Sequence, residues 1–80
     1  MKFGDVKVGD SVTRILGGTV VMKVKVTAVD DTFIYCSPPE QTWAKEDGWK
    51  FLRENGVEVD EELGWGKQED GTYLSGSFLK

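Results

Sequence analysis

The sequence predicts an all-β protein, folded as a small antiparallel barrel or rolled sheet of five to six short strands with at most one short helical turn. Residues 19–29 (TVVMKVKVTAV) alternate between two sets of side chains, and a period of two is typical of a strand with one buried face. Ten glycines and several turn-forming pairs divide the chain into short segments, as in a sheet joined by tight turns. Strands of this length close readily into a barrel, because closure removes exposed edges.

The first two predicted strands span residues 11–16 and 19–29, separated by the Gly17-Gly18 pair. The second strand carries both of its lysines on one face, so the other face should lie in the core. Its expected core residues are Val20, Met22, Val24, Val26 and Ala28.

A third predicted strand, residues 32–37, is rich in β-branched and aromatic residues. We expect Ile34 and Cys36, which share one face, to point into the core. Residues 37–48 then form a loop with one turn of helix at 41–47, because Pro38-Pro39 cannot continue a central strand.

The second half of the chain predicts a hairpin of residues 49–53 and 57–60 around Glu54-Asn55-Gly56, because an Asn-Gly pair between apolar runs favours a tight turn. In this hairpin Val57 and Val59 should point inward, with Glu58 and Asp60 in water. Asp60 should also cap a short turn at residues 61–63. A tight turn at Glu69-Asp70-Gly71 then leads into a closing strand, residues 73–79.

The charge balance limits the partners of the chain. Its net charge is −4, and residues 38–80 hold five basic and ten acidic side chains, a net charge of −5. Nonspecific binding to a phosphate backbone is driven by clustered Lys and Arg. The balance therefore argues against nucleic acid as the partner.

The chain also lacks the features of a membrane or secreted protein. No apolar run approaches the roughly 18–20 residues that span a bilayer, and MKFGDVKVGD lacks the apolar stretch of a signal peptide. Cys36 is the single cysteine, so it has no partner for an internal disulfide. These features predict one cytoplasmic domain over residues 1–80, without a membrane partner.

An enzyme is the class that the sequence supports least. The chain has no histidine, which excludes a Cys-His pair at Cys36 and any histidine-containing zinc site. The carboxylates near residue 60 do not have the spacing of an EF-hand loop; they are Glu58, Asp60, Glu61 and Glu62. We predict no catalytic residue, no metal and no cofactor.

Two stretches resemble families of uncharacterised bacterial proteins. Residues 9–36 are similar to the YodC-like family, and their Gly-Asp-x-Val opening also resembles KOW and other SH3-like barrel modules. The matching residues are Gly9, Asp10, Val12, Gly17, Gly18, Met22, Val24 and Cys36. This resemblance implies an SH3-like barrel and brings no established activity.

Residues 49–66 resemble a second uncharacterised bacterial family, with the pattern Trp-x-Phe, a Thr-Gly turn, Glu-Ile-Asp and Leu-Gly-Trp-Gly. The matching residues are Trp49, Phe51, Gly56, Glu58, Asp60, Leu63, Gly64, Trp65 and Gly66. Leu52 and Asn55 depart from the pattern, which has Asp and Thr there.

Two kinds of binding surface are compatible with the sequence. In the first, a noncatalytic module binds a protein or peptide through aromatic residues next to carboxylates, which would suit a basic partner. The residues of this surface are Tyr35, Trp43, Trp65, Asp60, Glu61 and Glu62. The alternative, by analogy with KOW modules, is a nucleic-acid surface built from Arg14, Lys23 and Lys25. Either module would be a monomer or a weak homodimer, the latter by pairing along residues 73–79.

Overall fold

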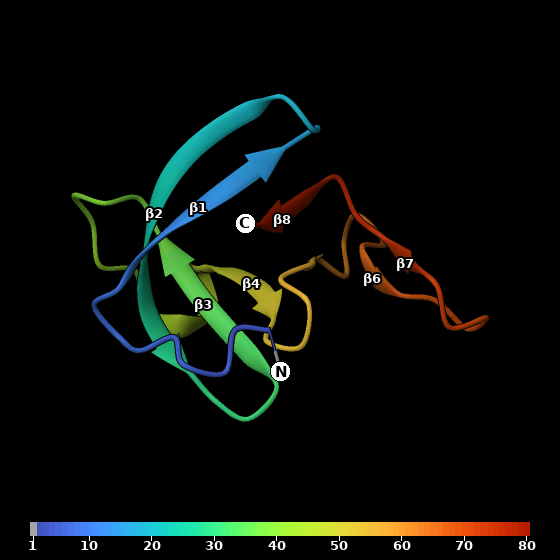
Figure 1. Ribbon diagram of the computed structural model, residues 1–80, viewed down its shortest axis with the longest axis horizontal. Helices are drawn as coiled ribbons and strands as arrows, with labels where there is room; N and C mark the ends of the chain where they lie inside the picture. Colours follow the sequence, from blue (N-terminus) through green and yellow to red (C-terminus); the bar gives the residue numbers. More distant parts are fainter. Residues whose placement is uncertain (1) are drawn as a thin grey trace.

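The computed structural model describes residues 2–80 and contains eight strands and one short 3-10 helix (Figure 1). The main sheet consists of β1 (Ser11–Leu16), β2 (Val20–Val29), β3 (Phe33–Ser37), β4 (Trp49–Leu52), β5 (Glu58–Val59) and β8 (Ser77–Leu79). A separate hairpin consists of β6 (Gly66–Lys67) and β7 (Tyr73–Leu74), and the 3-10 helix η1 spans Lys45–Asp47. The predicted all-β fold with one helical turn is confirmed.

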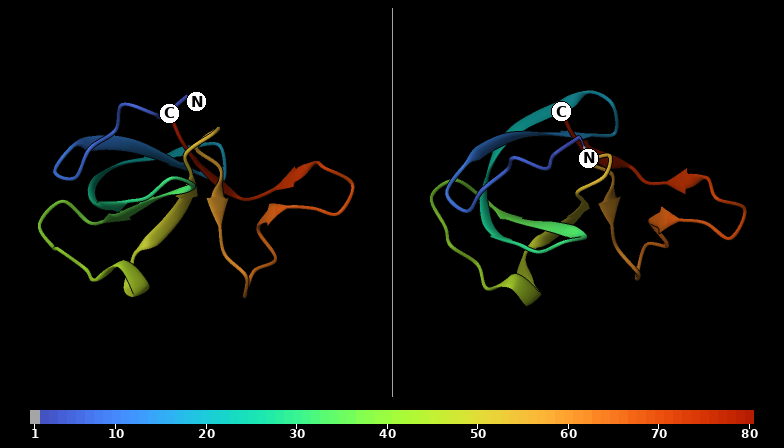
Figure 2. Two further views of the ribbon diagram at one scale, coloured as in Figure 1. Left: turned by 90° about the horizontal axis from the view of Figure 1, so that it is seen from below. Right: turned by 60° about the horizontal axis from the view of Figure 1, so that its bottom comes forward.

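The main sheet rolls into a nearly closed antiparallel barrel. Its strand order is β5-β4-β3-β2-β1-β8, so β5 and β8 are the two ends of the sheet. An antiparallel bridge between Val57 and Phe78 joins these ends, and the Leu79 N–H donates to the Gly56 carbonyl oxygen at 2.7 Å. Figure 2 shows the resulting ring of strands from two further directions. The bridge satisfies backbone groups that an open sheet would expose.

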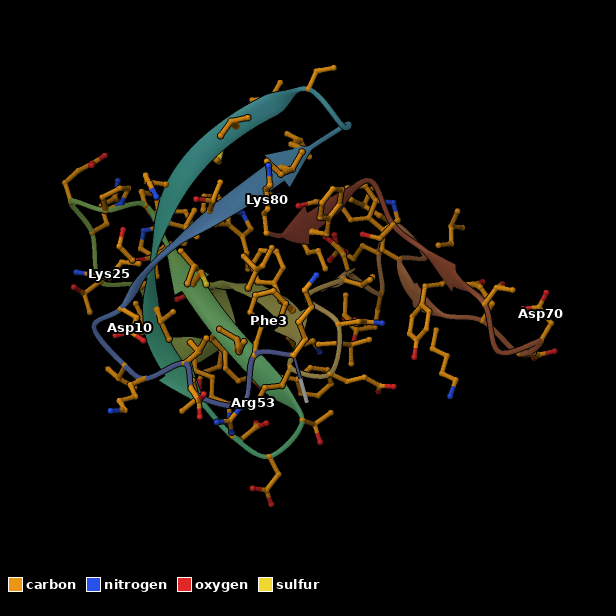
Figure 3. All side chains as sticks on the ribbon, viewed as in Figure 1. Phe3, Asp10, Lys25, Arg53, Asp70 and Lys80 are labelled. Carbon is orange, nitrogen blue, oxygen red and sulfur yellow. The ribbon has the colours of Figure 1, made fainter. Side chains whose placement is uncertain are left out.

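The core lies inside this ring and consists of Phe3, Val24, Val26, Ile34, Cys36, Phe51 and Leu79. Ile34 and Cys36 are fully buried, as predicted. Phe3 precedes the first strand and lies in the middle of the ring (Figure 3). Its backbone N–H donates to the Arg53 carbonyl oxygen at 3.1 Å, which fixes the N-terminal segment across the barrel.

The alternation in β2 predicts its inner face only in part. Val24 and Val26 are buried and Met22 packs against the core. The pairing with β3 shifts between Val26 and Ala28, and a bulge of this kind moves the following residue to the other face. As a result Val29, instead of Ala28, packs against the core.

The expectation that Val20 is also a core residue is wrong. Val20 is 50% exposed, although it lies on the predicted inner side of β2. It pairs with Leu16 at the end of the β1–β2 hairpin. Because this end extends past the ring of strands (Figure 1), no core remains there to cover it.

The predicted hairpin around Asn55-Gly56 forms from β4 and β5, but its faces are reversed in β5. Phe51 pairs with Glu58, and Lys50 pairs with Val59. Residues opposite each other on antiparallel strands share a face, so Glu58 joins Phe51 on the core side. The prediction that Glu58 points into water is therefore wrong, because the register of the turn decides the face.

The predicted closing strand, residues 73–79, is divided into two strands with different partners. β7 pairs with β6, and β8 pairs with β1. Gly76 lies between them, where an added Cβ would be 2.7 Å from the Trp65 ring. The predicted Glu69-Asp70-Gly71 turn joins β6 to β7 with a φ of +88° at Gly71. Figure 3 shows Asp70 at the tip of this hairpin, away from the barrel.

Candidate functional site

A groove of about 470 Å³ lies beside β4, between the β3–β4 loop with η1 and the β5–β6 loop. Both loops extend to the same side of the sheet, with β4 between them (Figure 2, left). Tyr35, Trp49, Gly48 and Val59 contribute its uncharged lining. Its charged lining consists of Lys45, Lys50, Glu46, Glu58, Asp60, Glu61 and Glu62, so five carboxylates and two lysines give a net charge of −3.

Tyr35 lies at the groove with its ring largely buried, 7% exposed. Its hydroxyl donates to Asp30 Oδ2 at 3.2 Å. Burial, and then this hydrogen bond, raises the pKa of Tyr35 above its usual value. Lys45 Nζ lies 4.9 Å from the ring centroid and 3.7 Å from Asp30 Oδ2, so η1 is held over the Tyr35 ring.

Lys50, the cross-strand partner of Tyr35, also interacts with other residues of the protein. Its Nζ lies 2.9 Å from Glu61 Oε1 and 4.8 Å from the centroid of Phe33. The hydrogen bond from Lys50 holds the pKa of Glu61 below its usual value. Both lysines of the groove are thus paired with carboxylates of the same chain.

The remaining carboxylates of the groove differ in their partners. Asp60 Oδ1 accepts from the backbone N–H groups of Glu62 (3.0 Å) and Leu63 (3.2 Å), which confirms the predicted cap of the turn at 61–63. Glu46 and Glu62 form no salt bridge within residues 2–80. The two loops therefore carry unpaired negative charge on opposite sides of the groove.

The structure brings four of the six predicted binding residues to this groove: Tyr35, Asp60, Glu61 and Glu62. Trp43 and Trp65 do not line it. Trp43 is half-buried, because its ring packs edge-to-face on Trp49 with centroids 5.2 Å apart. The Trp65 backbone exchanges two hydrogen bonds with Asp60, and its half-buried ring contacts Gly76.

A buried ion pair lies behind the groove, inside the barrel. Arg14 Nη2 is 2.7 Å from Glu58 Oε1, and the side chains of both residues are buried. Arg14 Nε also lies 3.0 Å from Ser77 Oγ, and its guanidinium stacks 4.4 Å from the Trp49 ring centroid. Such a pair is tolerated only when hydrogen bonds satisfy its polar atoms, and every buried side-chain N or O within residues 2–80 has a partner.

The position of Arg14 corrects its assignment to a basic surface. It is only 6% exposed, since it shares the inner face of β1 with Val12 and Leu16. Lys23 and Lys25 lie on the outer side, where their Nζ atoms donate to Thr13 Oγ1 and Thr42 Oγ1. The three residues therefore do not form one surface.

Several groove residues were not predicted from the sequence, among them Lys45, Glu46, Gly48 and Lys50. Gly48 has a steric role, because an added Cβ would lie 2.8 Å from the Cys36 carbonyl oxygen. Because Gly48 has no side chain, the loop that contains η1 can lie directly against β3.

No group of three or more metal-ligating side chains occurs in the described part of the chain. None of its helices is long and apolar enough to cross a membrane. The chain matches no protein-family model, no curated protein and no solved structure.

Proposed function

We propose that this protein is a noncatalytic interaction module that binds a basic protein or peptide segment in the groove beside β4. The observation that carries this proposal is the pair of carboxylates without a cation, Glu46 and Glu62, on opposite walls of one groove. Opposite charge in a partner would both steer the encounter and fix its orientation.

The lining of the groove suits a lysine or arginine side chain. These side chains combine an apolar stem with a charged head. The stem would pack on Val59 and Trp49, while the head would lie between Glu46 and Glu62. The two lysines of the groove should repel such a head only weakly, because Lys45 is paired with Asp30 and Lys50 with Glu61.

Cys36 supports a noncatalytic role. Burial raises the pKa of its thiol to about 12, so the thiol stays protonated and unreactive at neutral pH. The lone, unpaired cysteine also supports a cytoplasmic location, where thiols are kept reduced. A bacterial origin is part of the same proposal and rests on the resemblances in residues 9–36 and 49–66.

Titrations with three probes test the proposal: a short lysine-rich peptide, a glutamate-rich peptide of equal length and a single-stranded oligonucleotide. The lysine-rich peptide should shift the amide resonances of the groove and lose affinity as salt is added. The glutamate-rich peptide should not bind. Stronger binding of the oligonucleotide, with shifts around Lys23 and Lys25, would overturn the proposal.

A pair of charge-matched variants localises the site. Glu46→Gln with Glu62→Gln should weaken binding of the lysine-rich peptide by about fivefold or more, because two carboxylates are lost from the groove. The control, Glu40→Gln with Glu69→Gln, removes the same charge from exposed positions outside the groove. Equal loss in both variants would show a general charge effect and contradict a site in the groove.

A further inference from the structure

The first half of β2 has a free edge. β3 pairs with β2 only from Lys25 to Val29, because the chain leaves the sheet at Pro38-Pro39 after Ser37. Residues 20–24 pair with β1 on one side, and no other strand within residues 2–80 pairs with them. In Figure 1 this half of β2 lies at the periphery with β1 on one side only.

Backbone groups of two residues point out from this edge. The Val26 N–H donates to Asp10 and its carbonyl oxygen accepts from Gly9, so both groups of Val26 point toward β1. Direction alternates along an antiparallel strand, and therefore Val24, Met22 and Val20 also point toward β1. Val21 and Lys23 direct their N–H and C=O groups to the free edge.

The free edge is apolar, and no charged side chain projects over it. Val20 is 50% and Val21 66% exposed, among the most exposed apolar side chains of the protein. Lysines on edge strands commonly prevent pairing. Lys23, however, turns its ammonium toward β1, where it donates to Thr13 Oγ1 at 3.1 Å. An incoming strand therefore meets free backbone groups and valine side chains.

We propose that the occupant of this edge is β2 of a second copy, paired antiparallel about a two-fold axis at Met22. In this register Val21 of each copy lies opposite Lys23 of the other, and the two pairs form four backbone hydrogen bonds. The two Met22 side chains meet on the inner face. A symmetric contact of this kind closes at the dimer.

Neighbouring registers are blocked by contacts of the chain itself. A shift by one pair toward the C-terminus would place Lys23 opposite Lys23, and it would use the edge of Lys25 that Ser37 already occupies. A shift the other way would require the Thr19 N–H, which already donates to the Leu16 carbonyl oxygen at 3.3 Å. Of these three registers, only the one with the two-fold axis at Met22 uses backbone groups that are free in the monomer.

The contact is short, so the dimer should be weak. An interface of one strand pair lies at the low end of specific interfaces, below about 1,200 Å². We therefore expect a monomer–dimer equilibrium that depends on protein concentration, and sedimentation velocity over a concentration series measures it.

Val21→Lys should shift this equilibrium to monomer, because the new lysine would lie opposite Lys23 of the other copy. The control is Val8→Lys, which adds the same charge at a residue that is 61% exposed and lies outside the free edge of residues 20–24. A wild-type protein that stays monomeric over the whole series, or two variants with equal effects, would overturn the proposal.

Single-cysteine crosslinking tests the register independently. Residues at position 22 would form a non-hydrogen-bonded pair with Cα atoms about 4.5 Å apart, within the disulfide range of about 4.4–6.8 Å. Positions 21 and 23 would each lie more than about 7 Å from their own copies, which is beyond that range. On mild oxidation Met22→Cys should therefore form a disulfide dimer faster than Val21→Cys and Lys23→Cys.

The expected order of crosslinking rates is opposite to the order of solvent exposure, since residues 21 and 23 are exposed and Met22 is half-buried. Collisional crosslinking would favour the exposed positions. The native Cys36 is buried and should not contribute. Faster crosslinking at 21 or 23, or no dependence on position, would rule out the two-fold axis at Met22.

Discussion

Arg14 and Glu58 form an ion pair inside the barrel, with Nη2 and Oε1 2.7 Å apart. They come from β1 and β5, 44 residues apart in the chain. Arg14 also contacts Ser77 Oγ, Met22 Sδ and the Trp49 ring. The pair therefore links β1 to both the β4–β5 hairpin and β8.

Removal of one partner of this pair should destabilise the fold strongly. Glu58→Gln or Arg14→Met should each lower the free energy of unfolding by about 3–5 kcal/mol, because each removes one of two buried opposite charges. The double variant Arg14→Met with Glu58→Gln should be less destabilised than the sum of the two single variants. Denaturant unfolding measures all three.

A surface pair provides the comparison. Lys50→Met removes the bridge to Glu61, whose side chain is 78% exposed, and exposed pairs contribute little to stability. Its effect should be much smaller than that of Glu58→Gln. Equal effects would mean that the Arg14–Glu58 pair is solvated in solution.

Asp30 should make the fold sensitive to acid. Backbone N–H groups of Phe33 and Thr32 donate to its Oδ1 at 2.7 and 2.9 Å, and these bonds lower the pKa of Asp30 below its usual value of 3.8. Because the folded-state pKa is the lower one, the stabilisation is present above pH 3.8 and is lost as the pH falls through the folded-state value.

Thermal unfolding between pH 5 and pH 2, roughly the range in which a lowered carboxylate titrates, checks this prediction. Asp30→Asn should flatten the dependence of the melting temperature on pH in that range. The lowered pKa values of Glu61 and Asp70 act with the same sign, so part of the dependence should remain. An unchanged profile would show that Asp30 does not contribute.

Cys36 should react with thiol reagents only after unfolding. Its side chain is fully buried, and burial raises its pKa to about 12, so the thiolate is scarce at pH 8. A colorimetric thiol reagent at that pH should label the protein at the rate of its opening, and immediately in denaturant. Rapid labelling of the native state would contradict the packing of β3.

Gly48→Ala should displace the η1 loop from β3. The added Cβ would lie 2.8 Å from the Cys36 carbonyl oxygen, and overpacking of this kind costs about 1–3 kcal/mol. The near-ultraviolet circular dichroism should change as well, since the loop positions the Trp43–Trp49 contact. An unchanged spectrum and stability would show that the loop is held elsewhere.

Glu58 and Gly76 show where sequence reasoning failed. The alternation of residues 57–60 gives two possible faces, and the pairing of Phe51 with Glu58 selects the one that buries the carboxylate. Residues 73–79 have the composition of one strand. They form two, because Gly76 lies against the Trp65 ring and the chain changes partners there.

The candidate groove could be predicted only in part for the same reason. Asp60, Glu61 and Glu62 are adjacent in sequence, and the cap at Asp60 is a local structure. Tyr35 reaches them through the pairing of β3 with β4, and Lys45 and Glu46 through the contact of Gly48 with Cys36. Long-range contacts of this kind have no local signal in a single sequence.

The sequence by itself determined the all-β class, the exact span of β1, the turns at Gly56 and Gly71, and the burial of Ile34 and Cys36. These features depend on local periodicity and on backbone conformations that favour glycine. Only the tertiary structure decided that Arg14 and Glu58 are buried, that Val29 replaces Ala28 in the core, and that β2 keeps a free edge. The reason is strand register, because a shift of one residue exchanges the two faces of a strand.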